Sequence, residues 1–196
     1  MTYPKDLINL INSLKKLPGV GGRTAERFAF ELLQWTKEDL QQFGQKIQSL
    51  HANVPACPAC GCLTGQGVCH FCERTEAKTL CLVASAKDVY AIDETKTFFG
   101  LYHVVEHLLS PLDGRHATSL RIDRIEERIK KHGIQEVIIA FDSTLEGDAT
   151  ALYLKNILSP LQLKITRLAF GLPLGSSLDH IDGGTLSRAF SGRQIL

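Results

Sequence analysis

The stretch that most constrains the fold reads Cys57-Pro58-Ala59-Cys60 and, eight residues later, Cys69-His70-Phe71-Cys72. Two C-x-x-C pairs at this spacing can close four thiolates into a tetrahedron, the coordination of a structural Zn²⁺ ion. The pattern therefore predicts one zinc ion per chain, bound by Cys57, Cys60, Cys69 and Cys72. It also predicts that the surrounding module unfolds when the metal is removed.

Alternative uses of these cysteines are weaker. Cys62 or His70 could in principle replace one of the four ligands, since both lie in the same stretch. A redox-active pair would need a thioredoxin-like βαβ setting, which this segment lacks. Four thiolates leave no open position for water, so the zinc is expected to be structural and not catalytic. Cys81 is expected to be a small buried side chain in a strand.

The residues before the cysteines have the period of amphipathic helices. Apolar residues recur at three- and four-residue steps between Asp6 and Leu17, and again after Gly22. A third helix is expected to be capped by Thr36, whose hydroxyl can accept a hydrogen bond from the amide of Asp39 or its neighbour. The first 50 or so residues are therefore predicted to be helical.

A glycine-rich turn, Leu17-Pro18-Gly19-Val20-Gly21-Gly22, separates the first two predicted helices and resembles a helix-hairpin-helix. Gly19 and Gly21 can adopt positive φ and let backbone amides approach a phosphate. The start of the second helix adds amides and a dipole that favour an anion. The basic residues around the turn are Lys15, Lys16, Arg23 and Arg27, with Glu26 as the one acid. We interpret the turn as a DNA contact that reads phosphates and not bases; the alternative is an αα-corner whose glycines serve geometry alone.

Downstream of the cysteines, short β-rich apolar runs alternate with helical stretches, which indicates a mostly parallel sheet with flanking helices. The predicted strands are residues 79–84, 101–105, 136–141 and 164–169, and a helix is expected at 122–131. The tail from Gly171 is Gly-rich, with a short helix expected at 184–190.

Three carboxylates, Asp142, Glu146 and Asp148, follow the strand at 136–141, at the edge where α/β sheets bind ligands. The arrangement resembles the Toprim motif of topoisomerases and primases, but Thr144 occupies the position of its second Asp and Ala84 that of its Glu. Mg²⁺ binding and catalysis are therefore not expected. Asp142 and Glu146 could instead cap the following helix, or the acids could form a docking surface for a protein.

The order of these modules, together with several phrases, resembles the RecR family of recombination mediators over almost the whole chain. The matching phrases are 17–21, the cysteine spacing, 100–104, 109–114, 146–150, 171–175 and 185–186. The corresponding division is a hairpin region at 1–53, a zinc module at 54–76, a Toprim-like domain at 77–170 and a C-terminal tail at 171–196. The chain departs from the family pattern at Ala84, at Asp142-Ser143, at Glu106-His107 and at Arg115-His116.

The resemblance implies a non-catalytic, DNA-binding protein of the bacterial cytosol, acting at the nucleoid. It implies a ring-like homo-oligomer, a dimer or tetramer, that clamps DNA and is joined through the helical N-terminus and the tail. It further implies that Arg23 and Arg27 face DNA. The implied partners are RecO, and RecF in some bacteria, which help RecA replace single-strand-binding protein.

Composition neither adds to this interpretation nor opposes it. Lys plus Arg number 22 and Asp plus Glu 21, so any nucleic-acid contact must be a local patch. No apolar segment approaches the length that spans a membrane, and no leader pattern precedes the first helix, so a cytoplasmic protein is expected. Two alternative functions remain: a Mg²⁺-dependent Toprim phosphoryl-transfer enzyme, nuclease or primase-like, and a zinc-stabilised protein adaptor.

Overall fold

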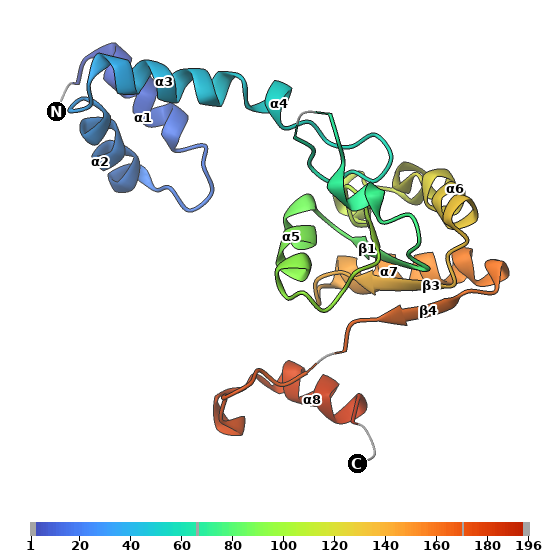
Figure 1. Cartoon of the computed structure of the whole chain (residues 1–196). Helices are drawn as coiled ribbons and strands as arrows, with labels where there is room; N and C mark the ends of the chain where they lie inside the picture. Colours follow the sequence, from blue (N-terminus) through green and yellow to red (C-terminus); the bar gives the residue numbers. More distant parts are fainter. Residues whose placement is uncertain (1–2, 66, 170, 194–196) are drawn as a thin grey trace. The chain divides into compact units, whose positions relative to one another are not determined.

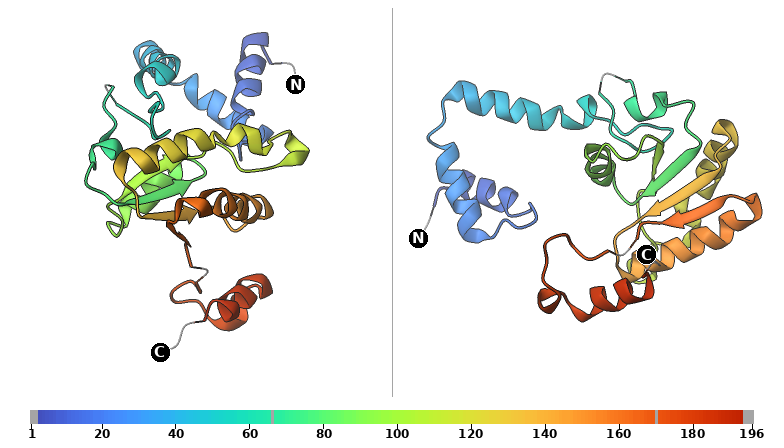
Figure 2. Two further views of the ribbon diagram at one scale, coloured as in Figure 1. Left: turned by 90° about the vertical axis from the view of Figure 1, so that its right-hand side faces the viewer. Right: turned by 60° about the horizontal axis from the view of Figure 1, so that its bottom comes forward.

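The computed structural model describes residues 3–65, 67–169 and 171–193 of the chain. The chain divides into two compact units, Met1–Asn53 and Val54–Leu196, which are described separately. Both can be followed in Figure 1 and, from two other sides, in Figure 2. In the part of the chain that the structure describes, no helix has the length and apolar content needed to cross a membrane.

The first unit is helical, as predicted. Its helices are α1 (Lys5–Leu14), α2 (Gly22–Leu32), α3 (Lys37–Gln48) and the short α4 (Leu50–Asn53). The predicted cap of α3 is confirmed, because the Thr36 hydroxyl accepts a hydrogen bond from the Asp39 amide at 3.1 Å. The first helix ends three residues earlier than its apolar pattern, since the amides of Lys16 and Leu17 bond carbonyls three residues back and tighten the last turn.

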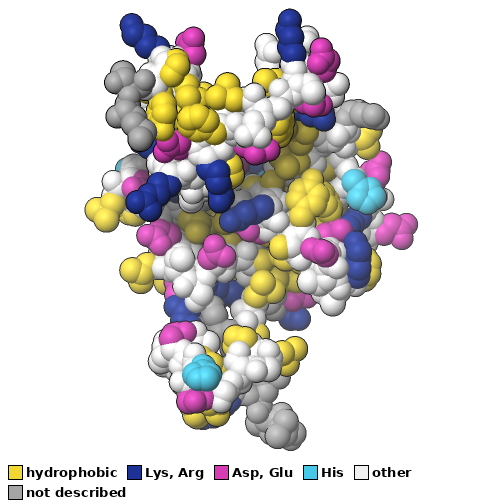
Figure 3. All heavy atoms as spheres, turned by 90° about the vertical axis from the view of Figure 1, so that its left-hand side faces the viewer, with side chains coloured by type: hydrophobic (Ala, Val, Ile, Leu, Met, Phe, Trp, Pro, Cys, Tyr) yellow, Lys and Arg dark blue, Asp and Glu magenta, His cyan; other side chains and the backbone are white. Residues whose placement is uncertain are grey.

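This first unit buries very little. Of its described residues, only Ala25 and Ala29 are buried, both on α2. Large apolar side chains remain exposed instead, among them Phe28, Phe30, Leu33, Trp35, Phe43 and Ile47. Hydrophobic side chains gather on the helices of this unit in the upper part of Figure 3.

The second unit contains the predicted parallel sheet. Its strands are β1 (Thr79–Val83), β2 (Leu101–Val104), β3 (Glu136–Ala140) and β4 (Lys164–Arg167), in the spatial order β2-β1-β3-β4 with every pair parallel. The helices are α5 (Ala86–Glu94), α6 (Ile122–His132), α7 (Leu145–Leu158) and α8 (Gly183–Ser191). Short 3₁₀ turns, including one at His70–Glu73, complete the unit.

The two faces of the sheet are covered by different elements of the chain. The chain passes from β1 to β2 in one direction and from β2 through β3 to β4 in the other, so right-handed crossovers place α5 opposite α6 and α7. The right-hand view of Figure 2 shows this division. One face packs Leu82 and Val137 against α6 and α7. The other packs Tyr102 and Val83 against α5 and against the segment at 54–76 that carries the cysteine pairs, called the cysteine segment below.

The cysteine segment also covers the outer edge of β2, which has no neighbouring strand. The Val104 amide donates a 2.7 Å hydrogen bond to the Cys60 carbonyl, and the Tyr102 carbonyl accepts one from Arg128 of α6 at 3.2 Å. Gly61 lies so close to β2 that a Cβ there would be 2.8 Å from the Cβ of Val104. An uncovered edge would offer unpaired backbone groups to other chains, and here they are used within the unit.

Glycine substitutions in the cysteine segment test this close approach. Gly61 has φ +74° and no room for a Cβ, Gly67 has φ +80° and open space, and Gly65 is neither strained nor crowded. Gly61→Ala should lower the free energy of unfolding by about 2–5 kcal/mol, Gly67→Ala by about 1–2 kcal/mol, and Gly65→Ala by about 0. Denaturant titration of the three variants measures this, and equal losses at Gly61 and Gly67 would show that contact with β2 contributes nothing.

Candidate metal centre and nucleic-acid interface

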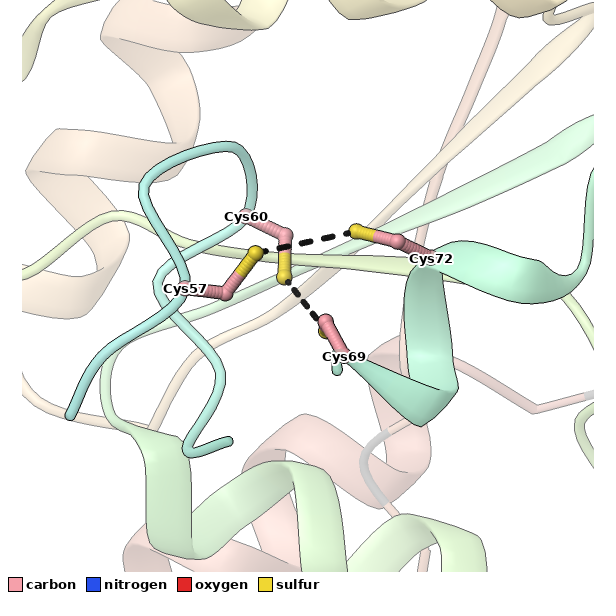
Figure 4. A group of neighbouring side chains, drawn as sticks. All are labelled: Cys57, Cys60, Cys69 and Cys72. Atoms are coloured by element: carbon pink, nitrogen blue, oxygen red, sulfur yellow. Dashed lines mark hydrogen bonds between the residues drawn. The ribbon is translucent and has the colours of Figure 1, made fainter. Parts of the chain in front are cut away.

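The four predicted cysteines come together at one point. Their sulfur atoms all lie within 4.8 Å of one another. The Sγ atoms of Cys60 and Cys69 are 3.4 Å apart, and those of Cys57 and Cys72 are 3.9 Å apart (Figure 4). A tetrahedron with Zn–S bonds of about 2.3 Å has sulfur–sulfur separations of about 3.8 Å. The four sulfurs are therefore spaced as ligands of one tetrahedral ion, and the donor set fits zinc.

The two alternative ligands lie outside this group. The side chain of His70 is 82% exposed and lies beside Glu73, at 3.6 Å. Cys62 is fully buried next to Cys60 but does not join the four sulfurs. Of the residues that the structure describes, only Cys57, Cys60, Cys69 and Cys72 form a group of three or more side chains that could hold a metal ion.

Burial and polar contacts act on the sulfurs in opposite directions. Burial is the largest single effect on Cys57 and raises its pKa, but hydrogen bonds from the amides of Ala59 and Cys60 and contacts with the Cys60 and Cys69 thiols outweigh it, so the pKa of Cys57 is lowered. The pKa values of the other three thiols are raised, that of Cys60 mainly by its hydrogen bond with Cys62 and those of Cys69 and Cys72 mainly by burial. Arg128 donates from Nη1 to the Cys72 sulfur at 3.5 Å, and its residue is only 6% exposed. A Zn²⁺ ion with four thiolates carries a net charge of −2, so a buried guanidinium beside it offsets part of that charge.

The backbone of the glycine turn in the first unit is open, as the sequence indicates, but only one of the two glycines predicted to use positive φ does so. Gly19 has φ +79°, whereas the prediction that Gly21 also uses positive φ is wrong: Gly21 has φ −78° and is the N-cap of α2. It has no side chain to cap the helix, and a Cβ at Gly19, Gly21 or Gly22 would touch nothing within 4 Å. The first amides of α2 are therefore open to solvent.

The basic residues around this turn are all exposed: Lys15, Lys16, Arg23 and Arg27. Across residues 3–65, 67–169 and 171–193, no carboxylate forms an ion pair with any of the four. The one nearby acid, Glu26, accepts a hydrogen bond from the Tyr3 hydroxyl. The turn thus presents uncompensated positive charge beside open amides.

The acidic residues after β3 do not form a cation site. Asp142 and Glu146 are exposed, while the Asp148 carboxylate binds Arg167 of β4 at 2.6 Å and Arg188 of α8 at 2.9 Å. The hydrogen bond from Arg167, together with the charge of Arg188, lowers the pKa of Asp148. Two guanidiniums therefore occupy one of the three carboxylates at this edge.

The alternative that Asp142 caps α7 is also wrong. The N-cap is Thr144, whose hydroxyl accepts a hydrogen bond from the Gly147 amide at 3.1 Å. Glu146 does lie in the first turn of α7, where a negative charge complements the helix dipole. The residue that departs from the Toprim pattern thus serves the helix and not a metal.

Sequence reasoning missed Arg128, Arg167 and Arg188. Their partners are between 19 and 56 residues away in the chain, so no local spacing marks them. The one available signal for Arg128 is its position on a predicted helix between two strands. Tyr102 and His103 are buried in β2, and burial together with Arg128 and Arg124 lowers the pKa of His103 to about 4.

Three family models match successive parts of the chain. The helix-hairpin-helix of RecR matches residues 7–51, the Toprim domain matches 78–169, and the C-terminal region of RecR matches 171–194. The cysteine segment lies between the first two matches.

Curated relatives match over nearly the full length. The chain is 49% identical over 195 residues to "Recombination protein RecR" of Protochlamydia amoebophila, covering 98% of each chain. It is 46% identical to the protein of the same name from Chlamydia abortus, again over 98% of each chain, and 46% identical to that of Chlamydia pneumoniae over 97% of each.

Ligand assignment can be tested with two buried cysteines of the same segment. We expect one zinc ion per purified chain, and Cys57→Ser should lose it and destabilise the segment, because three thiolates bind zinc more weakly than four. Cys62→Ser should retain the metal. Elemental analysis with thermal unfolding measures both, and a metal-free wild-type protein that is fully folded would contradict the assignment.

The contact between Arg128 and Cys72 makes a separate prediction. Arg128→Met should weaken zinc affinity about 10- to 100-fold, the usual effect of removing a hydrogen-bond donor to a metal ligand. Arg124→Met, one turn earlier on α6 and without a recorded contact to a cysteine, should leave it unchanged. Competition with a coloured chelator measures the affinity, and equal effects of the two variants would mean that the hydrogen bond to sulfur is unimportant.

Proposed function

The chain belongs to the RecR family, and from this we propose that it is a recombination protein that binds DNA through backbone phosphates and acts without enzymatic turnover. The glycine turn carries this proposal. It combines open amides at the start of α2 with four exposed basic residues that no recorded ion pair neutralises. Backbone amides and basic side chains at a helix N-terminus bind phosphate groups in many proteins.

The same geometry supports phosphate recognition over base reading. The turn presents open glycine backbone, the first amides of α2 and exposed basic side chains. Contacts of this kind fix a protein on nucleic acid but carry no sequence information. Binding should therefore be independent of sequence and should weaken steeply as salt concentration rises.

The acidic edge of the sheet supports the proposed absence of turnover. Phosphoryl transfer at such an edge needs carboxylates free to hold Mg²⁺. Of the three positions of the Toprim pattern, Asp142 keeps a carboxylate, Thr144 caps α7 and Ala84 follows β1, while the nearby Asp148 is bound by two arginines. This arrangement favours a DNA-binding role over the alternative of a nuclease or primase-like enzyme.

Zinc is the ion we propose for the four cysteines, one per chain. Residues Cys57, Cys60, Cys69 and Cys72 supply four thiolates, a soft donor set that suits zinc. When bound, the ion would supply structural cross-linking only, because no coordination position remains for water or substrate. The cysteines would thus hold their segment against the sheet.

We further propose that copies of this chain associate through the first unit and the tail. A unit with only Ala25 and Ala29 buried among residues 3–53 cannot be stabilised by its own core, and its exposed apolar residues need cover. The tail has an apolar hollow of about 290 Å³, lined by Leu172, Leu178, Leu186, Ala189, Phe190 and Arg193. A second copy offers matching apolar surfaces, and a dimer or tetrameric ring around DNA would bury both.

Within the cell, family membership suggests a place among mediator proteins. We propose that the chain works in the bacterial cytoplasm with a RecO-like protein, and where present a RecF-like protein, to help RecA replace single-strand-binding protein. The first unit and the tail would then serve assembly, and the exposed acids Asp142 and Glu146 are available as a protein-docking surface.

Charge reversal at the turn tests DNA binding. Arg23→Glu with Arg27→Glu should abolish binding of labelled DNA in fluorescence anisotropy at low salt, because two phosphate contacts become repulsive. Lys37→Glu with Lys46→Glu makes the same change in charge on exposed residues of α3 and should have a much smaller effect. Incubation with Mg²⁺ should leave the DNA intact on a gel.

Each departure from these results has a definite meaning. Unchanged affinity after reversal at Arg23 and Arg27 would exclude the turn as the DNA contact. Cleaved DNA would restore the enzymatic alternative. A wild-type protein that binds no DNA at low salt, while still capturing a protein partner, would favour the adaptor.

A further inference from the structure

A hollow lined by basic residues lies in the Val54–Leu196 unit, between the first cysteine pair and α6. Its volume is about 300 Å³. Its lining residues are Pro58, Ala59, Arg124, Glu127, Arg128, Lys131 and His132. The residues belong to two segments that metal binding would hold together, because Cys57 and Cys60 flank Pro58 and Ala59 while Arg128 contacts Cys72. The hollow therefore has one wall fixed by the cysteine segment and another formed by a helix.

The basic residues of α6 form one stripe on the helix. Arg124, Arg128 and Lys131 stand at positions i, i+4 and i+7, which lie on the same helical face. The core face of α6 is separate and carries Ile125 and Ile129. If these cations served only to keep the helix surface in contact with water, they would not need to lie together on the face opposite Pro58 and Ala59.

Pairing among the charges of α6 leaves this stripe positive. Arg121 and Lys130 form ion pairs with Asp123 and Glu126, at 3.8 and 3.9 Å. In the described parts of the chain, Arg124 and Lys131 have no carboxylate within ion-pair distance. Glu127 is the single acid in the lining. Because the guanidinium of Arg128 lies beside the four thiolates and offsets part of their charge, the positive excess of the hollow comes from Arg124 and Lys131.

Arg128 forms the floor of the hollow and is nearly buried. Two of its nitrogens bond the Cys72 sulfur and the Tyr102 carbonyl, and its Nε has no partner in the part of the chain that the structure describes. The imidazole of His132 adds no charge at neutral pH, since burial and the neighbouring cations lower its pKa. Because the terminal nitrogens of Arg128 are already bonded and its Nε is buried, an acceptor with several oxygens entering the hollow would meet donors from the helix wall, Arg124 and Lys131.

The lining also indicates the chemistry of the ligand. It contains no Phe, Tyr or Trp ring, the side chains that most often stack on bases in single-strand binding. Arg124 and Lys131 are separated by about 10 Å along the helix axis, or about three nucleotide steps at 3.4 Å each. The donors therefore suit separate phosphates of one backbone better than one small anion.

We propose that this hollow is a second phosphate-binding contact for the sugar–phosphate backbone of nucleic acid. It lies in a different unit from the glycine turn. The proposal deepens the proposed function and rests on it, because DNA is taken as the polyanion that the chain meets. Its residues, including the wall formed by Pro58 and Ala59, are separate from those of the turn.

Matched pairs of substitutions on α6 test the proposal. Arg124→Gln with Lys131→Gln removes the stripe, and Arg121→Gln with Lys130→Gln removes one arginine and one lysine that already have acidic partners. In anisotropy titrations of labelled duplex DNA against the full-length protein, log affinity decreases linearly with log salt concentration. For the first pair this dependence should become shallower by about 1.8 per contacting chain, because two phosphate contacts are lost. The second pair should leave the slope unchanged. Unaltered zinc content and thermal unfolding show that each variant is folded.

The possible outcomes separate this proposal from the proposed function. An unchanged slope for Arg124→Gln with Lys131→Gln, while reversal at Arg23 and Arg27 still abolishes binding, overturns the hollow alone. Equal decreases for both α6 pairs show a general charge effect and also overturn it. Failure of the wild-type protein to bind DNA at low salt overturns both proposals. Binding of polyglutamate is measured in parallel. If Arg124→Gln with Lys131→Gln loses polyglutamate binding but keeps DNA binding, the hollow binds an acidic peptide and the nucleic-acid contact is contradicted.

Discussion

The closure of the cysteine segment on the free edge of β2 is the constraint on which the larger unit depends. The Cys60 carbonyl bonds the Val104 amide, Arg128 bonds the Tyr102 carbonyl, and Gly61 allows the backbones to approach. The segment contributes few large apolar side chains, with Phe71 the largest that is buried. Without a metal, four cysteines, two of them buried, would have to keep this position through weak contacts, so metal binding, edge protection and cover for one face of the sheet are coupled.

Several acids are paired with bases within the molecule, while others, such as Asp142 and Glu146, are exposed. Asp148 binds two arginines, and the acids on the flank of α6 bind Arg121 and Lys130. The bases of the glycine turn and the α6 stripe have no such partners in the described parts of the chain. A net charge near zero therefore conceals two positive sites. This pattern supports a protein that holds polyanions and does not activate water or a metal at its acidic edge.

Much of the fold could be predicted from the sequence because its signals are local. The four strands and the helices at residues 22–32, 122–132 and 183–191 follow apolar period and turn residues, and Thr36 marks its helix through a neighbour three residues away. The four cysteine ligands follow from spacing. The role of Arg128 could not be predicted, since Cys72 is 56 residues distant and meets it only because β2 is an edge strand. The conformation of Gly21 and the choice of Thr144 over Asp142 as cap were also beyond prediction, because either choice suits the local sequence.

Hydrogen–deuterium exchange with and without a chelator tests the central claim most directly. If metal binding holds the cysteine segment against β2, chelation should remove protection from residues 57–72 and from the Val104 amide, while β3 and α7 remain protected longer. Amides whose hydrogen bonds depend on a local closure exchange when that closure opens. Unchanged protection at Val104 after complete metal removal would contradict the account, because the edge would then be held without the cysteine cluster.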